Sequence, residues 1–276
     1  MDKKKCIITG SNGYLGRQLS IIFKKYGWQV VELSSSNKDD QFNFDLKNIE
    51  NFKYNVLEKC NLLIHTAYDF SANSFEKSIS TNVNGSEKLF HFAKKMNVEK
   101  IIHISSLSSF NKAKSIYGRT KIEIEKVSKK YGVINLRAGL FFGGDSKLIE
   151  KISNICKKIP IIPLIGNGSF KLHLCHYEDL SNFILNIYND KNCDLSEIYY
   201  CCSKTSITFK QLIKKISNNK LTIPIPVNFI IIFLKMIEAT KIKLPLNLDN
   251  LYGLILYNDE IKFENSDKYK ILFRTL

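Results

Sequence analysis

Two tyrosine–lysine pairs in the sequence have a spacing that could support proton transfer to a hydroxyl group. Tyr117 and Lys121 are four residues apart, as are Tyr200 and Lys204, and this spacing places two side chains on one face of a helix. A tyrosine accepts a proton near neutral pH only if a neighbouring cation lowers its pKa from about 10. With 13 tyrosines and 37 lysines in 276 residues, about two such pairs are expected by chance, so the surrounding elements must decide.

The elements around Tyr117 and Lys121 favour this pair over the other. A helix is predicted over residues 115–131, and the strand predicted before it, residues 100–105, leads into Ser106. Tyr200 lies in a strand-like segment, where positions four apart have no reason to converge. A serine hydroxyl beside the tyrosine could hold the reacting oxygen, so the sequence predicts an acid–base site between this strand and this helix.

A glycine-rich turn near the N-terminus is suited to a phosphate-containing ligand. Gly10, Gly13 and Gly16 follow the strand predicted over residues 5–9 and begin the helix predicted over 14–26. Glycine permits a tight turn and close approach of the main chain, and the first N–H groups of a helix attract a pyrophosphate. The spacing is G-x-x-G-x-x-G rather than G-x-G-x-x-G, but its position between strand and helix favours dinucleotide binding over a plain turn.

Both features belong to a regular alternation of short apolar strands and longer helices. The further strands and helices that we expect cover residues 28–33, 42–46, 61–67 and 133–136, and residues 82–96, 179–188 and 208–217. Strands that are apolar throughout are typical of a parallel sheet covered on both faces. The pattern predicts an α/β fold: a Rossmann-type doubly wound parallel sheet in residues 1–160, with a smaller C-terminal lobe in residues 161–276 at the carboxyl edge, where such folds bind ligands.

Taken together, the motifs resemble the extended branch of the short-chain dehydrogenase/reductase superfamily, the NAD-dependent epimerase/dehydratase family. Residues 9–16 are similar to the opening motif of that branch, and residues 102–125 are similar to its serine strand and Y-x-x-x-K helix. Shorter similarities lie at residues 81–85, 136–143, 166–168, 176–180 and 265–273. In the second of these, Ala138 replaces the proline of the family. The resemblance covers essentially the whole chain and implies a Rossmann domain with a substrate-binding lobe.

The resemblance also implies a role for individual residues. Tyr117 would be the general acid/base, Lys121 would hold the nicotinamide ribose and lower the pKa of Tyr117, and Ser106 would hydrogen-bond the reacting oxygen. The residues that would bind an NAD(P) cofactor are Gly10, Gly13, Tyr14, Leu15, Gly16, Ser34, Asp45, Leu46, Ala67, Asn82, Tyr117 and Lys121. The residues that would contact the substrate are Ser106, Lys171 and His176.

The position that reads the adenosine ribose favours NADP(H) over NAD(H). By the spacing of the family this position is Ser34, followed by two serines, Asn37 and Lys38, whereas a carboxylate there would bind the ribose hydroxyls and repel a 2′-phosphate. If the strand ended sooner, Glu32 could serve instead and restore a preference for NAD. Asp45 is either the acidic residue that contacts adenine or the N-cap of a following helix.

The expected substrate is a nucleotide-activated sugar, changed by epimerisation or 4-keto reduction. Sugar-nucleotide members commonly carry an arginine where Leu172 stands, and only the neighbouring Lys171 could substitute for it as a point charge. One alternative is an NADPH-dependent reductase of a non-nucleotide carbonyl compound. The other is a non-catalytic cofactor-binding sensor or assembly subunit, against which the retained serine, tyrosine and lysine argue. A homodimer is left open.

The composition of the chain indicates its cellular compartment more than the reaction that it catalyses. The net charge is +15, but 37 lysines and only four arginines are spread along the chain, which favours a solvated lysine surface over a nucleic-acid site. Seven cysteines without a C-x-x-C pair indicate a reduced, cytoplasmic setting. No apolar run approaches the roughly 18 residues of a membrane span, and residues 229–234 are expected to be the buried start of a helix. No metal site is expected, because the histidines lack ligand spacing.

Overall fold

The chain is described by a computed structural model that covers residues 3–144, 146–195, 197–240, 247–256 and 261–276. Its centre is a parallel six-stranded sheet with the order β10-β5-β4-β3-β1-β2. These strands are β1 (Lys5–Thr9), β2 (Gln29–Leu33), β3 (Leu62–His65), β4 (Lys100–Ser106), β5 (Ile134–Ala138) and β10 (Ile198–Cys201). The predicted doubly wound α/β fold is confirmed.

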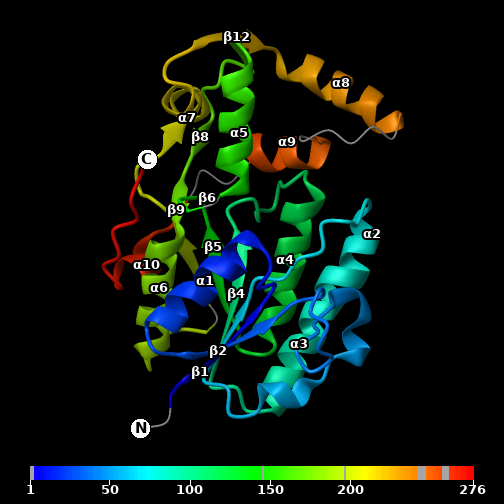
Figure 1. Cartoon of the computed structure of the whole chain (residues 1–276), viewed down its shortest axis with the longest axis vertical. Coiled ribbons are helices and arrows are strands. Elements are labelled where there is room, and N and C mark those ends of the chain that lie inside the picture. The colour runs from blue at the N-terminus through cyan, green and yellow to red at the C-terminus, as the bar shows by residue number, and fades with distance from the viewer. Residues whose placement is uncertain (1–2, 145, 196, 241–246, 257–260) are drawn as a thin grey trace.

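Helices cover both faces of the sheet (Figure 1). Helices α1 (Tyr14–Lys25) and α6 (Tyr177–Asn189) pack together on one face, and α3 (Asn84–Lys95) and α4 (Ile116–Lys129) pack together on the other. The strands have apolar residues at consecutive positions because alternate side chains enter two separate cores. Cys6 and Ile8 face the core with α1 and α6, whereas Ile7 between them faces the core with α3 and α4.

One predicted strand does not form. Residues 42–46 contribute only an isolated bridge between Ser34 and Asn43, and they are followed by two short 3₁₀ helices, η1 (Leu46–Asn51) and η2 (Tyr54–Leu57). The reason is local, because the carboxylate of Asp45 accepts a hydrogen bond from the main-chain N–H of Lys47 at 3.0 Å and so begins a helical turn. The prediction of a strand over residues 42–46 was therefore wrong.

The second half of the chain contributes to the large sheet and also forms a separate end of the molecule. Strand β10 and helix α6 complete the sheet and one of its faces, so the boundary after residue 160 stays a prediction. Three small two-stranded sheets follow: β6 (Leu140–Phe142) with β9 (Leu174–His176), β7 (Ile161–Ile165) with β12 (Leu221–Ile225), and β8 (Lys171–Leu172) with β11 (Ile207–Thr208). The remaining α-helices of the described residues are α2 (Phe75–Ser78), α5 (Lys147–Lys158), α7 (Phe209–Ile216), α8 (Val227–Ala239), α9 (Leu248–Ile255) and α10 (Glu264–Asp267).

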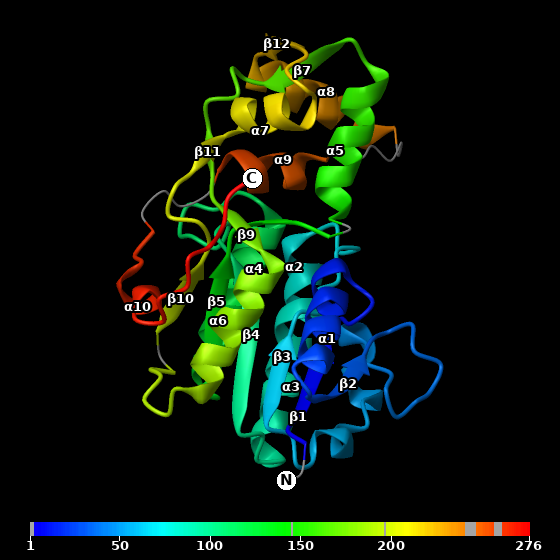
Figure 2. The ribbon, with the colours of Figure 1, turned by 60° about the vertical axis from the view of Figure 1, so that its left-hand side comes forward.

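The apolar segment at residues 229–234 is helical but not buried. Helix α8 lies at the end of the molecule opposite the N-terminus and packs against α9 (Figures 1 and 2). Within the segment only Leu234 is buried, and Phe229 remains 69% exposed. The expectation of a buried helix start was wrong, because no element covers the outer face of α8 in the described part of the chain.

Two other features bear on the cellular setting. All seven cysteines are free and buried. Among the residues that the structure describes, no helix has both the length and the apolar character needed to cross a bilayer.

Candidate active site

The glycine turn lies where the direction of strand order changes. The chain moves outward from β1 to β2 and then returns to β3 on the other side of β1, which is the point where doubly wound sheets bind ligands. Gly10 has a φ of +70°, and a Cβ there would lie 2.8 Å from the Cα of Ala67, directly after β3. A Cβ on Gly16 would lie 2.3 Å from the carbonyl oxygen of Gly10. The glycines are therefore required by close main-chain packing.

The first turn of α1 is suited to binding an anion. Its N-cap residue, Gly13, provides no side-chain acceptor, and the first turn contains no acidic residue. The helix dipole adds positive potential at the first N–H groups of this helix. This arrangement fits the pyrophosphate of a dinucleotide.

The end of β2 carries hydroxyl groups rather than a carboxylate. β2 ends at Leu33, and Ser34 receives a hydrogen bond from the side-chain amide of Asn12 at 3.1 Å; the same amide also donates to Ser36. Glu32 lies inside the strand and forms an ion pair at 2.7 Å with Lys24 on α1. The alternative in which Glu32 reads the ribose therefore has no support from the position of the strand end.

The structure brings Ser106, Tyr117 and Lys121 together at the same edge. Ser106 ends β4 and Tyr117 is in the first turn of α4, near enough for Ser106 to lower the pKa of Tyr117. The Nζ atom of Lys121 lies 5.9 Å from the centre of the Tyr117 ring. Gly118 allows the start of α4 to pack closely against the main chain of Ser108, because a Cβ at this position would lie 2.2 Å from the carbonyl oxygen of Ser108.

The second tyrosine–lysine pair diverges, as its place in a strand predicts. Tyr200 lies in β10 and its hydroxyl accepts a hydrogen bond from Arg137 at 3.3 Å. Lys204 instead forms an exposed ion pair with Asp267 at 2.8 Å. Equal spacing in the sequence thus corresponds to two different arrangements, because only the pair on a helix shares a face.

Lys121 is held in a buried polar network that the sequence did not reveal. Its ammonium group donates to the carbonyl oxygen of Ile104 at 2.8 Å and lies 3.1 Å from Nε2 of His103. The Nδ1 atom of His103 faces the amide oxygen of Asn135 at 2.9 Å, so Nδ1 carries the proton and Nε2 accepts. Burial lowers the pKa of Lys121 to about 7, partly opposed by Glu125. His103 is buried and contacts the lysine.

Tyr117 is enclosed by aromatic rings. The ring of Tyr68 meets it edge-on at 4.9 Å, and Phe70, which is 74% exposed, stacks on it at 5.7 Å. Burial raises the pKa of Tyr117, Tyr68 raises it further, and the neighbouring Ser106 side chain lowers it. Tyr117 is therefore a neutral phenol in this state, ready to donate a proton, and it needs an added positive charge before it can act as a base.

The C-terminal lobe reaches back to hold the start of α4. The carboxylate of Asp249, in the first turn of α9, accepts hydrogen bonds from the main-chain N–H groups of Ile116 and of Tyr117, the latter at 3.3 Å. Ser108 donates to the carbonyl oxygen of Gly253 at 3.1 Å. Burial raises the pKa of Asp249, and these main-chain hydrogen bonds partly offset this effect. Asp249 thus positions the turn that carries Tyr117, although nothing in its local sequence indicates this.

Two of the residues expected to bind the cofactor have structural contacts of their own. Asp45 caps η1, which is the second of the two interpretations left open for it. Asn82 is fully buried in the π-helical turn η3 (Ile79–Val83) and holds the main chain of Asp69 through hydrogen bonds of 2.7 and 3.0 Å. Asn82 therefore anchors the loop that carries Tyr68 and Phe70 over Tyr117. Contacts of these residues with a cofactor stay predictions.

Besides Ser106, the residues expected to contact the substrate are His176 and Lys171, and they lie in different environments. His176 is buried, accepts a hydrogen bond from the main-chain N–H of Glu178 at 3.3 Å, and packs against Gly143, whose carbonyl oxygen accepts from the hydroxyl of Tyr14 at 2.7 Å. Lys171 is exposed on β8. His176 therefore joins the exit of the sheet near the glycine turn, whereas Lys171 belongs to the lobe.

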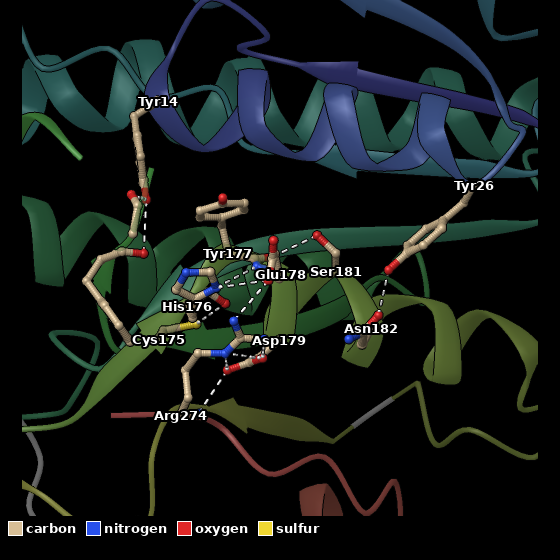
Figure 3. Close-up of polar contacts among 12 residues, drawn as sticks. Tyr14, Tyr26, Cys175, His176, Tyr177, Glu178, Asp179, Ser181, Asn182 and Arg274 are labelled. Atoms are coloured by element: carbon tan, nitrogen blue, oxygen red, sulfur yellow. Dashed lines mark hydrogen bonds and ion pairs between the residues drawn. The ribbon is translucent and has the colours of Figure 1, made fainter. Parts of the chain in front are cut away.

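The helix that begins at His176 is fixed by the C-terminal segment. Arg274 binds the carboxylate of Asp179 with Nη2 at 2.6 Å and Nε at 3.0 Å, and its Nη1 donates to Glu178 at 2.9 Å (Figure 3). Asp179, in the motif at residues 176–180, is therefore bound by Arg274, the residue that directly follows the motif at residues 265–273.

The lowered pKa of Lys121 should be visible in the pH dependence of folding stability. Its pKa of about 7 in the folded chain lies below the ordinary value of 10.5, so between these values the unfolded chain binds more protons and the free energy of unfolding rises with pH. Relative to Lys121→Met, we expect the wild type to gain about 1.4 kcal/mol per pH unit from about pH 7.5 to 9.5. Urea denaturation measures this, and Lys126→Met, on the exposed face of α4, is the control. Equal slopes for all three proteins would contradict the prediction.

The fold and this site define a class: a dinucleotide-binding α/β protein with a glycine turn after β1 and a serine, a tyrosine and a lysine at β4 and α4 of the same sheet. Residues 6–202 match the sequence model of the NAD dependent epimerase/dehydratase family, so the chain belongs to this family. The resemblance drawn from the motifs is thereby confirmed. The family is described as NAD-dependent epimerases and dehydratases, and the predicted enzyme class is confirmed at this level.

The chain is also similar to three proteins with different names. A Dictyostelium discoideum protein named NADH dehydrogenase [ubiquinone] 1 alpha subcomplex subunit 9, mitochondrial, is 25% identical over 245 residues, which cover 80% of this chain and 67% of the relative. Sterol-4-alpha-carboxylate 3-dehydrogenase, decarboxylating, from the same organism is 20% identical over 266 residues, covering 81% and 80%. The structure of MoeE5 in complex with UDP-glucose and NAD has a TM-score of 0.66 at 16% identity, covering 79% of this chain and 84% of that one.

Proposed function

We propose that this chain is an NAD(P)-dependent epimerase or 4-keto reductase of a nucleotide-activated sugar that uses Ser106, Tyr117 and Lys121. The observation that carries the proposal is the convergence of Ser106 at the end of β4, Tyr117 in the first turn of α4 and the buried Lys121, whose Nζ lies 5.9 Å from the centre of the Tyr117 ring. A proton donor and acceptor next to a dinucleotide site is the arrangement that hydride transfer at a carbinol or carbonyl carbon requires.

The proposed roles follow from the chemistry of the three side chains. The cofactor, when bound, supplies or accepts the hydride at the reacting carbon. In the reductive direction the Tyr117 hydroxyl gives its proton to the oxygen of the carbonyl group, and in the oxidative direction it takes the proton back. The Ser106 hydroxyl holds that oxygen, and the Lys121 ammonium stabilises the tyrosinate that forms. In an epimerase, the keto intermediate is reduced again on its opposite face.

A preference for NADP(H) is part of the proposal, because the end of β2 bears Ser34 and Ser36 with Lys38 nearby and no strand-end carboxylate. Replacing Ser34 by aspartate should lower affinity for NADPH at least about 10-fold through repulsion of the 2′-phosphate, while NADH affinity stays equal or rises. Titration of both cofactors by tryptophan or nicotinamide fluorescence measures this. Gln29→Asp, exposed at the opposite end of β2, is the control. Tighter binding of NADH than of NADPH by the wild type would contradict the preference.

A nucleotide-sugar substrate is supported by the family and by the UDP-glucose in the MoeE5 structure. A specific observation favours a second candidate, the reduction of a carbonyl compound without a nucleotide. Leu172, where sugar-nucleotide members commonly have an arginine, is buried in the core of the lobe, and the sterol dehydrogenase is similar over most of its length. The similarity to a subunit of a respiratory complex favours a third candidate, a cofactor-binding assembly subunit.

One experiment separates these candidates. The purified chain is assayed by thermal shift with NAD(H) and NADP(H), then with UDP-, dTDP- and GDP-sugars in the presence of the preferred cofactor, and turnover is followed at the nicotinamide absorbance and by sugar analysis. We expect stabilisation by a dinucleotide and by at least one nucleotide sugar. Dinucleotide binding without any response to nucleotide sugars would overturn the sugar assignment. No response to any dinucleotide would overturn the enzyme assignment.

The setting and assembly of the enzyme are also proposals. The free, buried cysteines support a reducing compartment, for which we propose the cytoplasm, although one relative is named as mitochondrial. A homodimer is proposed as one assembly to be tested by light scattering.

A further inference from the structure

Helix α8 presents an unusual stripe of large apolar side chains to solvent. Phe229, Ile232, Phe233 and Met236 are all exposed, and their spacing of three and four residues places them along one face of the helix. Phe229 and Met236, at the two ends of the stripe, are 69% and 66% exposed. A single exposed leucine or phenylalanine is ordinary, but a continuous stripe of this kind marks an interaction surface.

The elements around α8 extend this surface. The apical region, defined as residues 147–165 and 209–239, contains α5, β7, α7, β12 and α8 at the end of the molecule opposite the N-terminus (Figures 1 and 2). Among the described residues, fifteen large apolar side chains are exposed, and eight of them belong to this region. Besides the four on α8, they are Ile155, Ile161, Leu221 and Ile223. Exposed apolar side chains are therefore concentrated at one end of the protein.

The same region is strongly basic. It contains nine lysines and two glutamates, a formal charge of +7 within 50 residues of a chain whose total is +15. Lys157 and Lys158, in the last turn of α5, are both exposed, as is Lys214 on α7. A nucleic acid or a small anion would match the charge but not the exposed phenylalanines, and an ordinary apolar protein interface would match the phenylalanines but not the charge.

We propose that the apical region binds the surface of a lipid bilayer that contains anionic lipids, with the stripe on α8 inserted among the acyl chains at the interface. An apolar helix face combined with surrounding lysines is the pattern of a helix that lies in the plane of a membrane. α8 has 13 residues, too few to cross the hydrocarbon core, so it lies on the membrane rather than across it. Each lysine near an anionic surface adds attraction that salt weakens.

The proposal is independent of the proposed enzymatic function, because none of its residues belongs to the site around Tyr117. It gives a role to almost half of the positive charge that the sequence left as unassigned surface. It also orients the protein, with the nucleotide-binding sheet on the side away from the membrane (Figure 2).

Flotation of the full chain with vesicles tests the proposal. Wild type should float with vesicles of phosphatidylcholine and phosphatidylserine, float much less with phosphatidylcholine alone, and dissociate partly at high salt. Ile232→Asp should lower the partition coefficient about 10-fold or more, because a charge replaces an inserted side chain. Ile21→Asp, on α1, is the matched control, since Ile21 is 56% exposed and Ile232 is 57% exposed. Met236→Asp is a second variant, and unchanged thermal midpoints verify that each variant folds.

A second comparison tests the charge. Lys157→Ala with Lys158→Ala should weaken flotation several-fold on anionic vesicles only, whereas Lys129→Ala with Lys130→Ala, an exposed pair at the end of α4, should not. Equal flotation of Ile232→Asp and Ile21→Asp would overturn the proposal. Failure of the wild type to float with anionic vesicles would also overturn the proposal. If sedimentation then showed a dimer that Ile232→Asp dissociates, the stripe would be a contact between two copies of the chain.

Discussion

Replacement of Tyr117 by phenylalanine is expected to lower the turnover number by about 100- to 10,000-fold, the usual contribution of a positioned general acid/base. The aromatic ring and its contacts with Tyr68 and Phe70 are retained, so only the hydroxyl that faces Ser106 is lost. Cofactor affinity should change less than about threefold, since the glycine turn is untouched. Stopped-flow or steady-state kinetics with the substrate found in the nucleotide panel, together with cofactor titration, measure both quantities.

The matched control for Tyr117 is the other tyrosine of the two equally spaced pairs. Tyr200→Phe removes a hydroxyl that only accepts a long hydrogen bond from Arg137, so its kinetics should remain close to those of the wild type. Near-full turnover by Tyr117→Phe with bound cofactor would refute the assignment of the acid/base. A comparable loss in Tyr200→Phe would mean that the effect comes from the fold and not from proton transfer.

Replacement of Arg137 by methionine is expected to lower the free energy of unfolding by about 3–5 kcal/mol, because it leaves a buried carboxylate without its partner. Arg137 binds Glu125 through two parallel hydrogen bonds, Nε to Oε1 at 2.9 Å and Nη2 to Oε2 at 2.7 Å, and the side chains are 12% and 5% exposed. Ser105, next to Ser106, also donates to Glu125 at 2.6 Å. The pair therefore joins β4, α4 and β5 directly beneath the proposed catalytic residues.

Two variants separate charge burial from loss of packing. The double change of Arg137→Met with Glu125→Gln removes the unpaired charge and should recover at least about half of the lost stability. Lys24→Met breaks the exposed pair with Glu32 and should cost less than about 1 kcal/mol. Urea denaturation at neutral pH measures all four proteins. A cost for Arg137→Met no larger than that for Lys24→Met would show that the buried pair has no such role.

Much of the sheet could be predicted because its strands are defined by local sequence. Runs such as residues 5–9 and 100–106 have apolar residues at consecutive positions in their middle and are buried at nearly every position, which is the pattern required where both faces of a sheet are covered. The strand predicted over residues 42–46 failed because a single side chain, Asp45, caps a helical turn and competes with the extended conformation. The prediction that residues 229–234 are buried was wrong for a different reason. The apolar sequence favours a helix, but the burial of that helix depends on whether another element covers it.

Some residues of the candidate site could likewise be predicted from the sequence, and others could not. Ser106, Tyr117, Lys121 and the glycine turn could be predicted because each lies on a short motif with a defined place in the strand–helix alternation. His103 beside Lys121, Asn82 beneath the loop of Tyr68, and Asp249 above Tyr117 could not, since these contacts join residues whose types are common and whose sequence positions are far apart. Asp249 lies 132 residues from Tyr117, and no local pattern reports such a pairing.

The sequence alone therefore determined the class of fold, the family and the motif residues of the site, because these depend on periodicity and on spacing within single elements. Only the tertiary structure decided the environment of those residues: the burial that lowers the pKa of Lys121, the rings that enclose Tyr117, and the carboxylate of Asp249 that holds its turn. It also decided that the apolar helix α8 lies at the surface. The physical reason is that burial, desolvation and long-range hydrogen bonds exist only when separate elements pack together.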